Sequence, residues 1–209
     1  MSDTRPSAPG SFIADIEEIR RRARRHIENG AVTVNYKGDR KAVIQVLNEA
    51  LATELVCVLR YKRHYYMASG IHSQAVSEEF LEHAQEEQEH ADMIAERITQ
   101  LDGDPDFNPE TLPSRSHSQY IEGNSLVEMI REDLVAERIA IESYSEIIRY
   151  LGNNDPTSRR IMEEILAKEE EHAEDMKTLL ETISQEEKQR DQRAKEQSST
   201  AEAKSNQAA

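Results

Sequence analysis

Apolar residues recur at alternating steps of three and four residues over four long stretches of the chain. This spacing is that of one buried face of an α-helix. Gly70 follows the first stretch, Gly103 the second and Gly152 the third, while Asp155-Pro156 opens the fourth. Residues of these types end and begin helices. The pattern therefore predicts helices over residues 39–69, 73–101, 125–151 and 155–183.

Each predicted helix carries one glutamate near the middle of its apolar stripe. The four stripes are Leu47, Leu51, Glu54, Val58 and Tyr61; Phe80, Ala84, Glu87, Ala91, Ile94, Ile98 and Leu101; Ile130, Leu134, Glu137, Ile141, Tyr144, Ile148 and Leu151; and Met162, Ile165, Glu169, His172, Met176 and Leu179. Such stripes face a bundle core, and helices of about 25–30 residues span roughly 40 Å. We therefore expect an all-α four-helix bundle whose four glutamates meet at one level, far from either end.

The segments outside these helices differ from them in composition. Residues 104–123 form a long connection with proline and serine, which we expect to cross the bundle before the capping box Ser125-x-x-Glu128. Residues 11–28 fit a short amphipathic helix, whereas the small polar residues 1–10 are expected to be disordered. The chain thus divides into an N-terminal arm, 1–38, a bundle, 39–183, and a polar tail, 184–209, expected to be frayed or disordered.

The chain is acidic, with a net charge of −15. Such a charge repels nucleic acid on average and attracts cations. The exception is the run Arg-Arg-Arg-Ala-Arg-Arg from Arg20 to Arg25. It fits a solvated helix face paired with nearby acids, or a contact with DNA, RNA or an acidic partner chain.

A single cysteine, Cys57, excludes an internal disulfide, a thiolate metal site and a Cys-x-x-Cys redox pair. A reducing cytoplasm is the simplest compartment for such a chain. The sequence also shows no apolar signal core at its N-terminus and no stretch that approaches membrane-spanning length. We therefore expect no membrane association.

The stripe glutamates form a doubled pattern with histidines: Glu54, then Glu87 and His90, followed by Glu137, then Glu169 and His172. In each Glu-x-x-His pair the two side chains share a helix face, because positions three apart are neighbours. Buried carboxylates are costly to desolvate and repel one another, whereas two divalent cations neutralise four of them. We predict two metal ions, each with one terminal carboxylate, one imidazole and two bridging carboxylates. Iron or manganese suits such ligands, and zinc can compete.

Several neighbouring residues have more than one interpretation. Tyr61 and Tyr144 each follow a stripe glutamate by two turns, so they fit redox-active phenols near the metals or ordinary core tyrosines. This parallel also makes the first and second pairs of helices look like two copies of one hairpin. His64 fits a satisfied or exposed histidine near the end of the bundle. Four acids flank the ligands and are expected to point outward: Glu86, Glu89, Glu170 and Glu171.

These motifs resemble the bacterioferritin and Dps-like branch of the ferritin-like superfamily over about residues 45–182. The resemblance rests on residues 48–55 with Tyr61 and His64, and on residues 86–92, 95–98, 133–137 and 168–172. It implies a ferritin-like bundle with a long crossover between its second and third helices. By this resemblance Glu54 and Glu137 are terminal carboxylates, Glu87 and Glu169 are bridging carboxylates, and His90 and His172 are the imidazole ligands. Tyr61 matches a family tyrosine beside the ferroxidase centre.

The implied activity is the oxidation of ferrous iron by dioxygen or hydrogen peroxide, with mineral storage inside a homo-oligomeric cage. Family members that bind haem have a methionine directly after the bridging glutamate of the second helix, whereas Gln88 stands here. We therefore expect no haem. The tail lacks an apolar fifth helix, which weakens the case for a 24-subunit cage and leaves a 12-subunit Dps-like shell as the alternative.

Two other functions compete with a ferroxidase. A rubrerythrin-like peroxidase or a dimanganese catalase uses a similar centre, although a chain with one cysteine has no rubredoxin module. A Dps-like structural protein would instead protect DNA through Arg20–Arg25, and the overall acidity of the chain argues against it.

Overall fold

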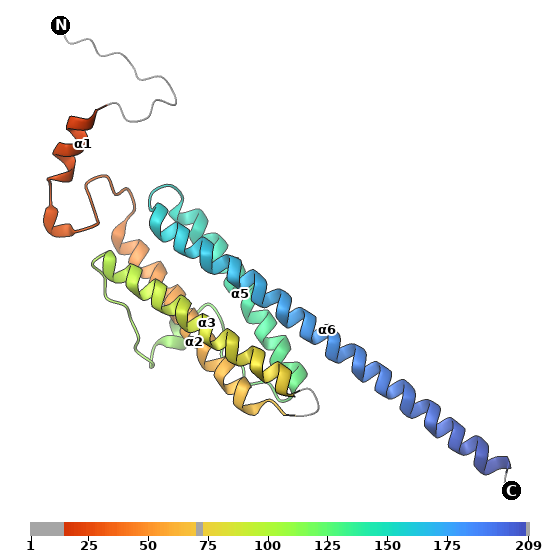
Figure 1. Ribbon diagram of the computed structural model, residues 1–209. Coiled ribbons are helices and arrows are strands. Elements are labelled where there is room, and N and C mark those ends of the chain that lie inside the picture. Colours follow the sequence, from red (N-terminus) through yellow and green to blue (C-terminus); the bar gives the residue numbers. More distant parts are fainter. Residues whose placement is uncertain (1–14, 70–72, 208–209) are drawn as a thin grey trace.

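The computed structural model describes residues 15–69 and 73–207, with side chains as far as residue 185. Four long helices pack lengthwise as a bundle (Figure 1). They are α2 (Arg40–Met67), α3 (Ser73–Gln100), α5 (Leu126–Leu151) and α6 (Pro156–Gln207). Helices α2 and α3 form one hairpin, and α5 and α6 form the other. The predicted all-α four-helix bundle is confirmed, while the disorder predicted for residues 1–10 lies outside the described residues.

Local capping explains where the helices begin. The side chains of Asp39, Ser125 and Asp155 each accept a hydrogen bond from the backbone N–H three residues further along, at 3.2, 3.2 and 2.9 Å. This contact satisfies one of the free N–H groups in the first turn of a helix. At the other end of α5, Gly152 adopts a φ of +48°, which favours glycine. The predicted starts of α2, α5 and α6 are therefore correct.

The connection between α3 and α5 runs along the length of α2 and contains the short helix α4 (Leu112–Arg115). Near its start, the Asn48 side chain donates to the carbonyl of Asp104 at 3.2 Å. Near its end, Arg60 Nη1 donates to the carbonyl of Gln119 at 3.0 Å. Because Asn48 and Arg60 lie more than three turns apart on α2, the connection crosses the bundle as predicted.

A buried charge network holds the end of this crossover. Arg60 is 1% exposed, and its Nε donates to Asp133 on α5 at 2.8 Å. The second oxygen of Asp133 lies 2.8 Å from His64 Nδ1, and the other ring nitrogen of His64 lies 3.1 Å from the carbonyl of Glu122. His64 is therefore a satisfied buried histidine. A charge pair at this depth is tolerated because each partner is also hydrogen-bonded.

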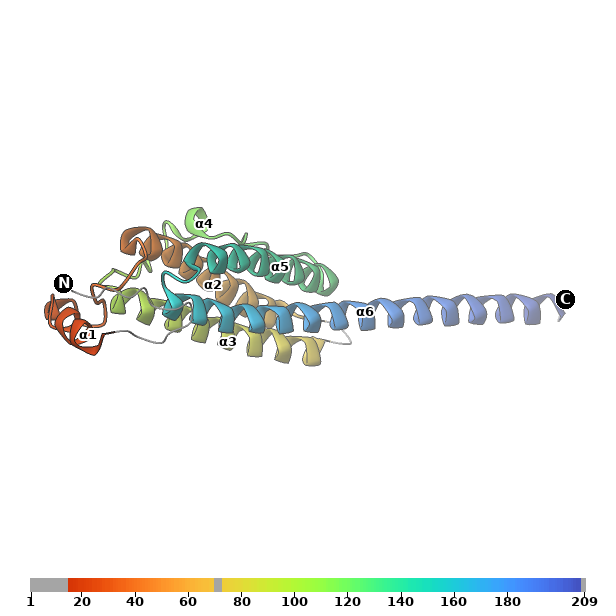
Figure 2. The same cartoon turned by 90° about the horizontal axis from the view of Figure 1, so that it is seen from above.

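Helix α6 is longer than the sequence pattern predicts. It continues to Gln207, well past the other three long helices (Figures 1 and 2), so residues 184–207 are helical where the sequence predicts a frayed or disordered tail. Residues 184–207 contain no glycine or proline and are rich in Glu, Lys, Gln, Arg and Ala, all strong helix formers. Ile183 is the last buried side chain in the described part of α6. The helix thus continues beyond its apolar stripe, where propensity favours it.

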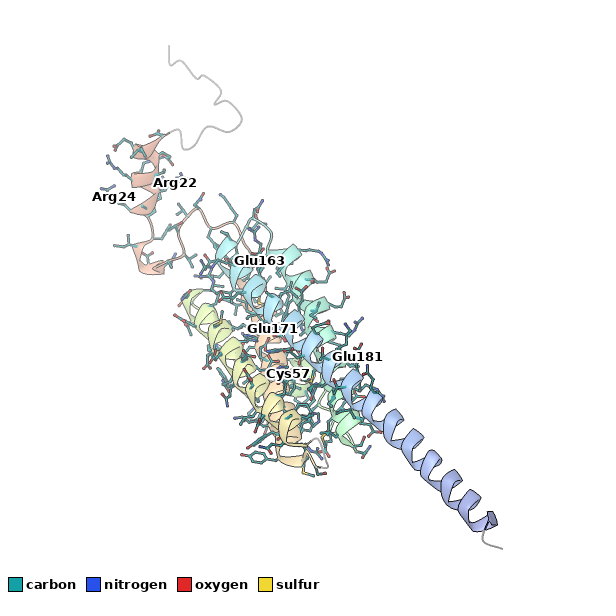
Figure 3. The ribbon with its side chains drawn as sticks, turned by 45° about the vertical axis from the view of Figure 1, so that its right-hand side comes forward. Arg22, Arg24, Cys57, Glu163, Glu171 and Glu181 are labelled. Carbon is teal, nitrogen blue, oxygen red and sulfur yellow. The ribbon has the colours of Figure 1, made fainter. Side chains whose placement is uncertain are left out.

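The N-terminal arm contains helix α1 (Ile16–Ala23) and the 3₁₀ turn η1 (Ile27–Asn29). His26, at a φ of +52°, separates them, which shortens the helix predicted over residues 11–28. No residue of α1 is buried, and Figure 3 shows Arg22 and Arg24 away from the bundle. Exposed ion pairs join Arg20 to Glu17, and Arg21 and Arg22 to Glu18. The contacts favour the interpretation of the basic run as a solvated helix face.

The two larger clusters of the apolar core have a polar layer between them. One cluster includes Leu47, Leu51, Ile94, Ile98, Tyr144 and Met162, and the other includes Tyr61, Phe80, Ala84, Ile130 and Met176. The mid-helix glutamates occupy the layer between these clusters. The core is thus interrupted at the level that the sequence assigns to metal.

Helix α2 is long and apolar enough to span a membrane, contrary to the expectation from the sequence. Over half of its apolar window is buried inside the bundle, and α2 also carries the buried polar residues Glu54, Arg60 and His64. Its apolar character is explained by contacts with α3, α4 and α5.

Cys57 lies on this helix within the bundle (Figure 3), and burial raises the pKa of its thiol.

Candidate metal centre

All six predicted ligands lie in the polar layer and are buried, the most exposed being His90 at 7%. Each long helix supplies at least one of them: Glu54 from α2, Glu87 and His90 from α3, Glu137 from α5, and Glu169 and His172 from α6. They meet because each occupies a core-facing position at the same level of its helix.

The six side chains form two overlapping groups, each compact enough for its ligand atoms to hold one metal ion. One group is Glu54, Glu87, His90 and Glu169, and the other is Glu87, Glu137, Glu169 and His172. Within each group the ligand atoms all lie within 4.8 Å of one another. Glu87 and Glu169 belong to both groups. The arrangement is the one expected for two ions that share two bridging carboxylates.

The Nδ1 atoms of both histidines face the carboxylates. His90 Nδ1 lies 3.0 Å from Glu169, 3.2 Å from Glu87 and 3.5 Å from Glu54. His172 Nδ1 lies 3.5 Å from Glu87 and 3.7 Å from Glu169. Each imidazole therefore directs one nitrogen toward its own group, as a ligand of that group must.

Several polar atoms of the layer have no hydrogen-bond partner in the described part of the chain: Glu87 Oε1, Glu137 Oε2, Glu169 Oε1 and His172 Nδ1. A buried polar atom without a partner costs about 1–3 kcal/mol. Four such atoms in one layer are explained if each coordinates a cation. The donor set of carboxylate oxygen and imidazole nitrogen also fits iron or manganese, and zinc can compete. The residues present therefore fit two metal ions.

The electrostatics of the layer reflect the same crowding. Burial, with repulsion from Glu87 and Glu169, raises the pKa of Glu54 and of Glu137. Burial opposes charge on His172 as well, but the carboxylates of Glu169 and Glu87 outweigh this effect and raise its pKa to about 11. Metal ions relieve this repulsion when they bind, and ligating carboxylates and histidines give up any protons they carry.

Two tyrosines hold the terminal glutamates in a crossed pattern. The Tyr61 hydroxyl on α2 donates to Glu137 on α5, and the Tyr144 hydroxyl on α5 donates to Glu54 on α2. Because α2 and α5 are antiparallel, each tyrosine approaches the layer from the apolar cluster on its own side. This exchange supports the internal repeat predicted from the sequence.

Two polar neighbours of the centre were not predicted. His83 is 2% exposed, and its ring stacks on His172 with 3.9 Å between ring centroids. Glu86, expected to point outward, is instead half-buried and lies 2.7 Å from His172 Nε2, whereas Glu89, Glu170 and Glu171 are exposed as expected. The signal for His83 was its position three residues after Phe80 and four before Glu87, which places it on the buried face.

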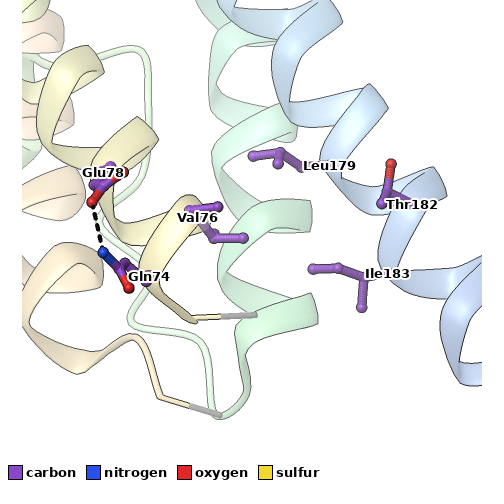
Figure 4. Close-up of a pocket in the computed structure, with 7 residues that line it drawn as sticks. Gln74, Val76, Glu78, Leu179, Thr182 and Ile183 are labelled. Atoms are coloured by element: carbon purple, nitrogen blue, oxygen red, sulfur yellow. Dashed lines mark hydrogen bonds between the residues drawn. The ribbon is translucent and has the colours of Figure 1, made fainter. Parts of the chain in front are cut away.

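An apolar groove lies elsewhere on the bundle. It has a volume of about 400 Å³ and is formed by Val76 and its neighbours on α3 with Leu179 and Ile183 on α6 (Figure 4). It lies at the end of the bundle where α6 leaves the other helices, so it does not form part of the ligand layer.

The model of the ferritin-like domain family matches residues 44–185. The chain belongs to the ferritin-like family. A bacterioferritin of Brucella melitensis is 32% identical over 151 residues, which cover 71% of this chain and 88% of that protein. A dodecameric thioferritin, the bacterioferritin-related protein of Bacteroides fragilis, is 33% identical with a TM-score of 0.70, over 73% of this chain and 92% of that one. These similarities confirm the resemblance to the bacterioferritin branch.

A Dps protein of Thermosynechococcus elongatus shares the fold with a TM-score of 0.65 at 20% identity, over 67% of this ferritin-like chain and 90% of that one. The stretch that the family model matches contains the six predicted ligands.

Proposed function

We propose that the protein is a ferroxidase that binds two ferrous ions in the polar layer and contributes to iron storage or detoxification as a homo-oligomeric cage. The observation that carries this proposal is the pair of ion-sized groups that share Glu87 and Glu169. Membership of the ferritin-like family and similarity to bacterioferritins support it. The single buried cysteine is consistent with a cytoplasmic location.

In this proposal the ferrous ions supply the electrons, and dioxygen or hydrogen peroxide accepts them. The protein supplies geometry and charge. Glu54 and His90 hold one ion, Glu137 and His172 hold the other, and Glu87 and Glu169 bridge them. Tyr61 and Tyr144 orient the terminal carboxylates through their hydroxyl groups. Glu86 lies against His172 Nε2 and so keeps Nδ1 turned toward the layer.

The ligand assignment is tested by Glu54→Ala and His90→Ala. Each removes one donor from the same ion, so we expect rapid aerobic oxidation of ferrous iron to fall at least tenfold while the far-ultraviolet circular dichroism keeps its helical signal. The exposed control Glu89→Ala, one residue before His90, should oxidise iron at the wild-type rate. Wild-type rates in both ligand variants would overturn the proposal.

Iron loading tests the storage part. Size-exclusion chromatography with light scattering and iron detection should show hundreds of iron atoms that co-elute with a large shell. About two iron ions per chain on a small oligomer would instead make the protein a catalytic di-iron enzyme without storage.

A further inference from the structure

A second cluster of potential ligands lies beside the polar layer. It consists of Glu79 and His83 on α3 and Asp175 on α6, whose ligand atoms all lie within 4.8 Å of one another. His83 is buried, whereas the side chains of Glu79 and Asp175 are 32% and 44% exposed. The cluster therefore has a buried nitrogen at its base and two carboxylates at its mouth, open to solvent.

The hydrogen bonds of Tyr61 fix the protonation of His83. The single hydroxyl proton of Tyr61 is donated to Glu137, so its oxygen can only accept from His83 Nδ1, which lies 3.2 Å away. Nδ1 then carries the ring proton, and Nε2 presents a lone pair. That lone pair points toward Glu79 and Asp175, and Nε2 makes no hydrogen bond within the described part of the chain.

The separations in this cluster fit a shared ion better than direct contacts. His83 Nε2 lies 3.5 Å from Glu79 Oε1 and 3.8 Å from Asp175 Oδ2, beyond the usual hydrogen-bond range of about 2.7–3.2 Å. Donor atoms bound to one ion at about 2.0–2.2 Å lie roughly 3–3.6 Å apart. Glu79 already meets this spacing, and the half-exposed Asp175 needs only a small rotation.

We propose that Glu79, His83 and Asp175 form a third metal site that binds one divalent cation beside the paired centre. Three electron-rich atoms that face one gap repel one another, and a cation between them relieves this repulsion. Burial and the Asp175 carboxylate also raise the pKa of Glu79, consistent with that crowding. Two oxygens and one imidazole nitrogen suit Fe²⁺, Mn²⁺ or Zn²⁺.

The third site is one imidazole ring away from the paired centre. A ring nitrogen of His83 also lies within 4.8 Å of ligand atoms of Glu137 and His172, and the His83 ring stacks on His172 with an interplanar angle of 21°. An ion at the third site is thus held between solvent and the buried layer. Its role as a transit site for ferrous iron rests on the proposed function, whereas binding itself does not.

Cobalt(II) is a suitable probe, because it binds such ligands and does not need to be oxidised. Equilibrium dialysis and calorimetry of the full chain should give three bound cobalt ions per chain for the wild type. The double variant Glu79→Gln/Asp175→Asn should bind two per chain. The matched control Glu78→Gln/Glu174→Gln removes two exposed carboxylates from the same helices and should retain three. Circular dichroism verifies that all variants are folded.

The reciprocal variant Glu54→Ala/His90→Ala separates this proposal from the proposed function. It removes two donors of one paired ion and leaves Glu79, His83 and Asp175 intact, so two ions per chain should still bind, one beside Glu137 and His172 and one at the third site. If the wild type and Glu79→Gln/Asp175→Asn bind the same number of ions, the third site does not exist, whatever the ferroxidase assays show.

Discussion

Tyr61 and Tyr144 are a natural matched pair, because each donates to a terminal glutamate and only Tyr61 contacts His83. Replacement of either by phenylalanine leaves a buried carboxylate without its donor. We expect each variant to lose about 1–3 kcal/mol of the free energy of unfolding in urea titrations of the metal-free protein.

The two variants should differ in catalysis. If Tyr61 has the catalytic role that the resemblance predicts, Tyr61→Phe slows the first turnover of ferrous oxidation in stopped-flow absorbance more than Tyr144→Phe does. Equal slowing in both variants would instead mean that the hydroxyls only orient Glu137 and Glu54.

For single residues, the sequence predicts the metal ligands better than it predicts the side chains that contact them. Glu87 and His90 are recognisable because their spacing and their place on the stripe agree. His83 is harder to assign, because both it and Ala84 fit the apolar spacing between Phe80 and Glu87, and both are buried. The crossed bonds of the tyrosines depend on how α2 and α5 lie side by side, which no local pattern encodes.

Among the elements, helix starts are predictable from the sequence because capping residues act locally. The end of α6 is not predictable in this way. Its apolar stripe ends at Ile183, but the following residues keep a high helix propensity. Burial and helix formation are separate properties of a sequence, and periodicity reports only the first. The crossover was predictable because a connection of that length has room to span the bundle.

The cap of α6 provides a test of pH dependence. Asp155 accepts from Ser158, Arg97 and Tyr36. Burial alone would raise its pKa, but the hydrogen bonds from Ser158 and the charge of Arg97 outweigh this and lower the pKa below the ordinary aspartate value of 3.8. A lowered folded-state pKa stabilises the fold above the unfolded-state pKa, and that contribution is lost as the pH falls through the folded-state value.

Asp155→Asn keeps a capping side chain but removes the charge. We therefore expect the wild type to be more stable than this variant at pH 7, and the difference in urea midpoint to shrink as the pH is lowered from 5 to 3. Asp39→Asn, at the cap of α2, is the matched control for loss of a cap carboxylate. A difference that stays constant down to pH 3 would contradict the role assigned to the charge of Asp155.

Across the whole molecule, the ligand layer separates the two larger apolar clusters of the core. The bundle must therefore be held together above and below the layer by packing, so that the carboxylates can remain close before any ion binds. The extension of α6 lies beyond both clusters, where it continues alone past the other helices (Figure 2). Most of the stability of a helix in a protein comes from tertiary packing rather than from propensity. The extension therefore contributes little to the stability of a single bundle.

Deletion of residues 186–209 tests whether the bundle is stable without the extension of α6. We expect the shortened protein to bind the same number of cobalt ions, to lose part of its helical circular dichroism, and to keep its thermal midpoint within about 2 °C, since removal of an unpacked segment changes stability by no more than about 0.5 kcal/mol. Light scattering on both forms then reports on assembly. A larger fall in the midpoint, or a smaller oligomer, would mean that the extension packs against a neighbouring copy. The end of α6 would then belong to the contacts that build the cage.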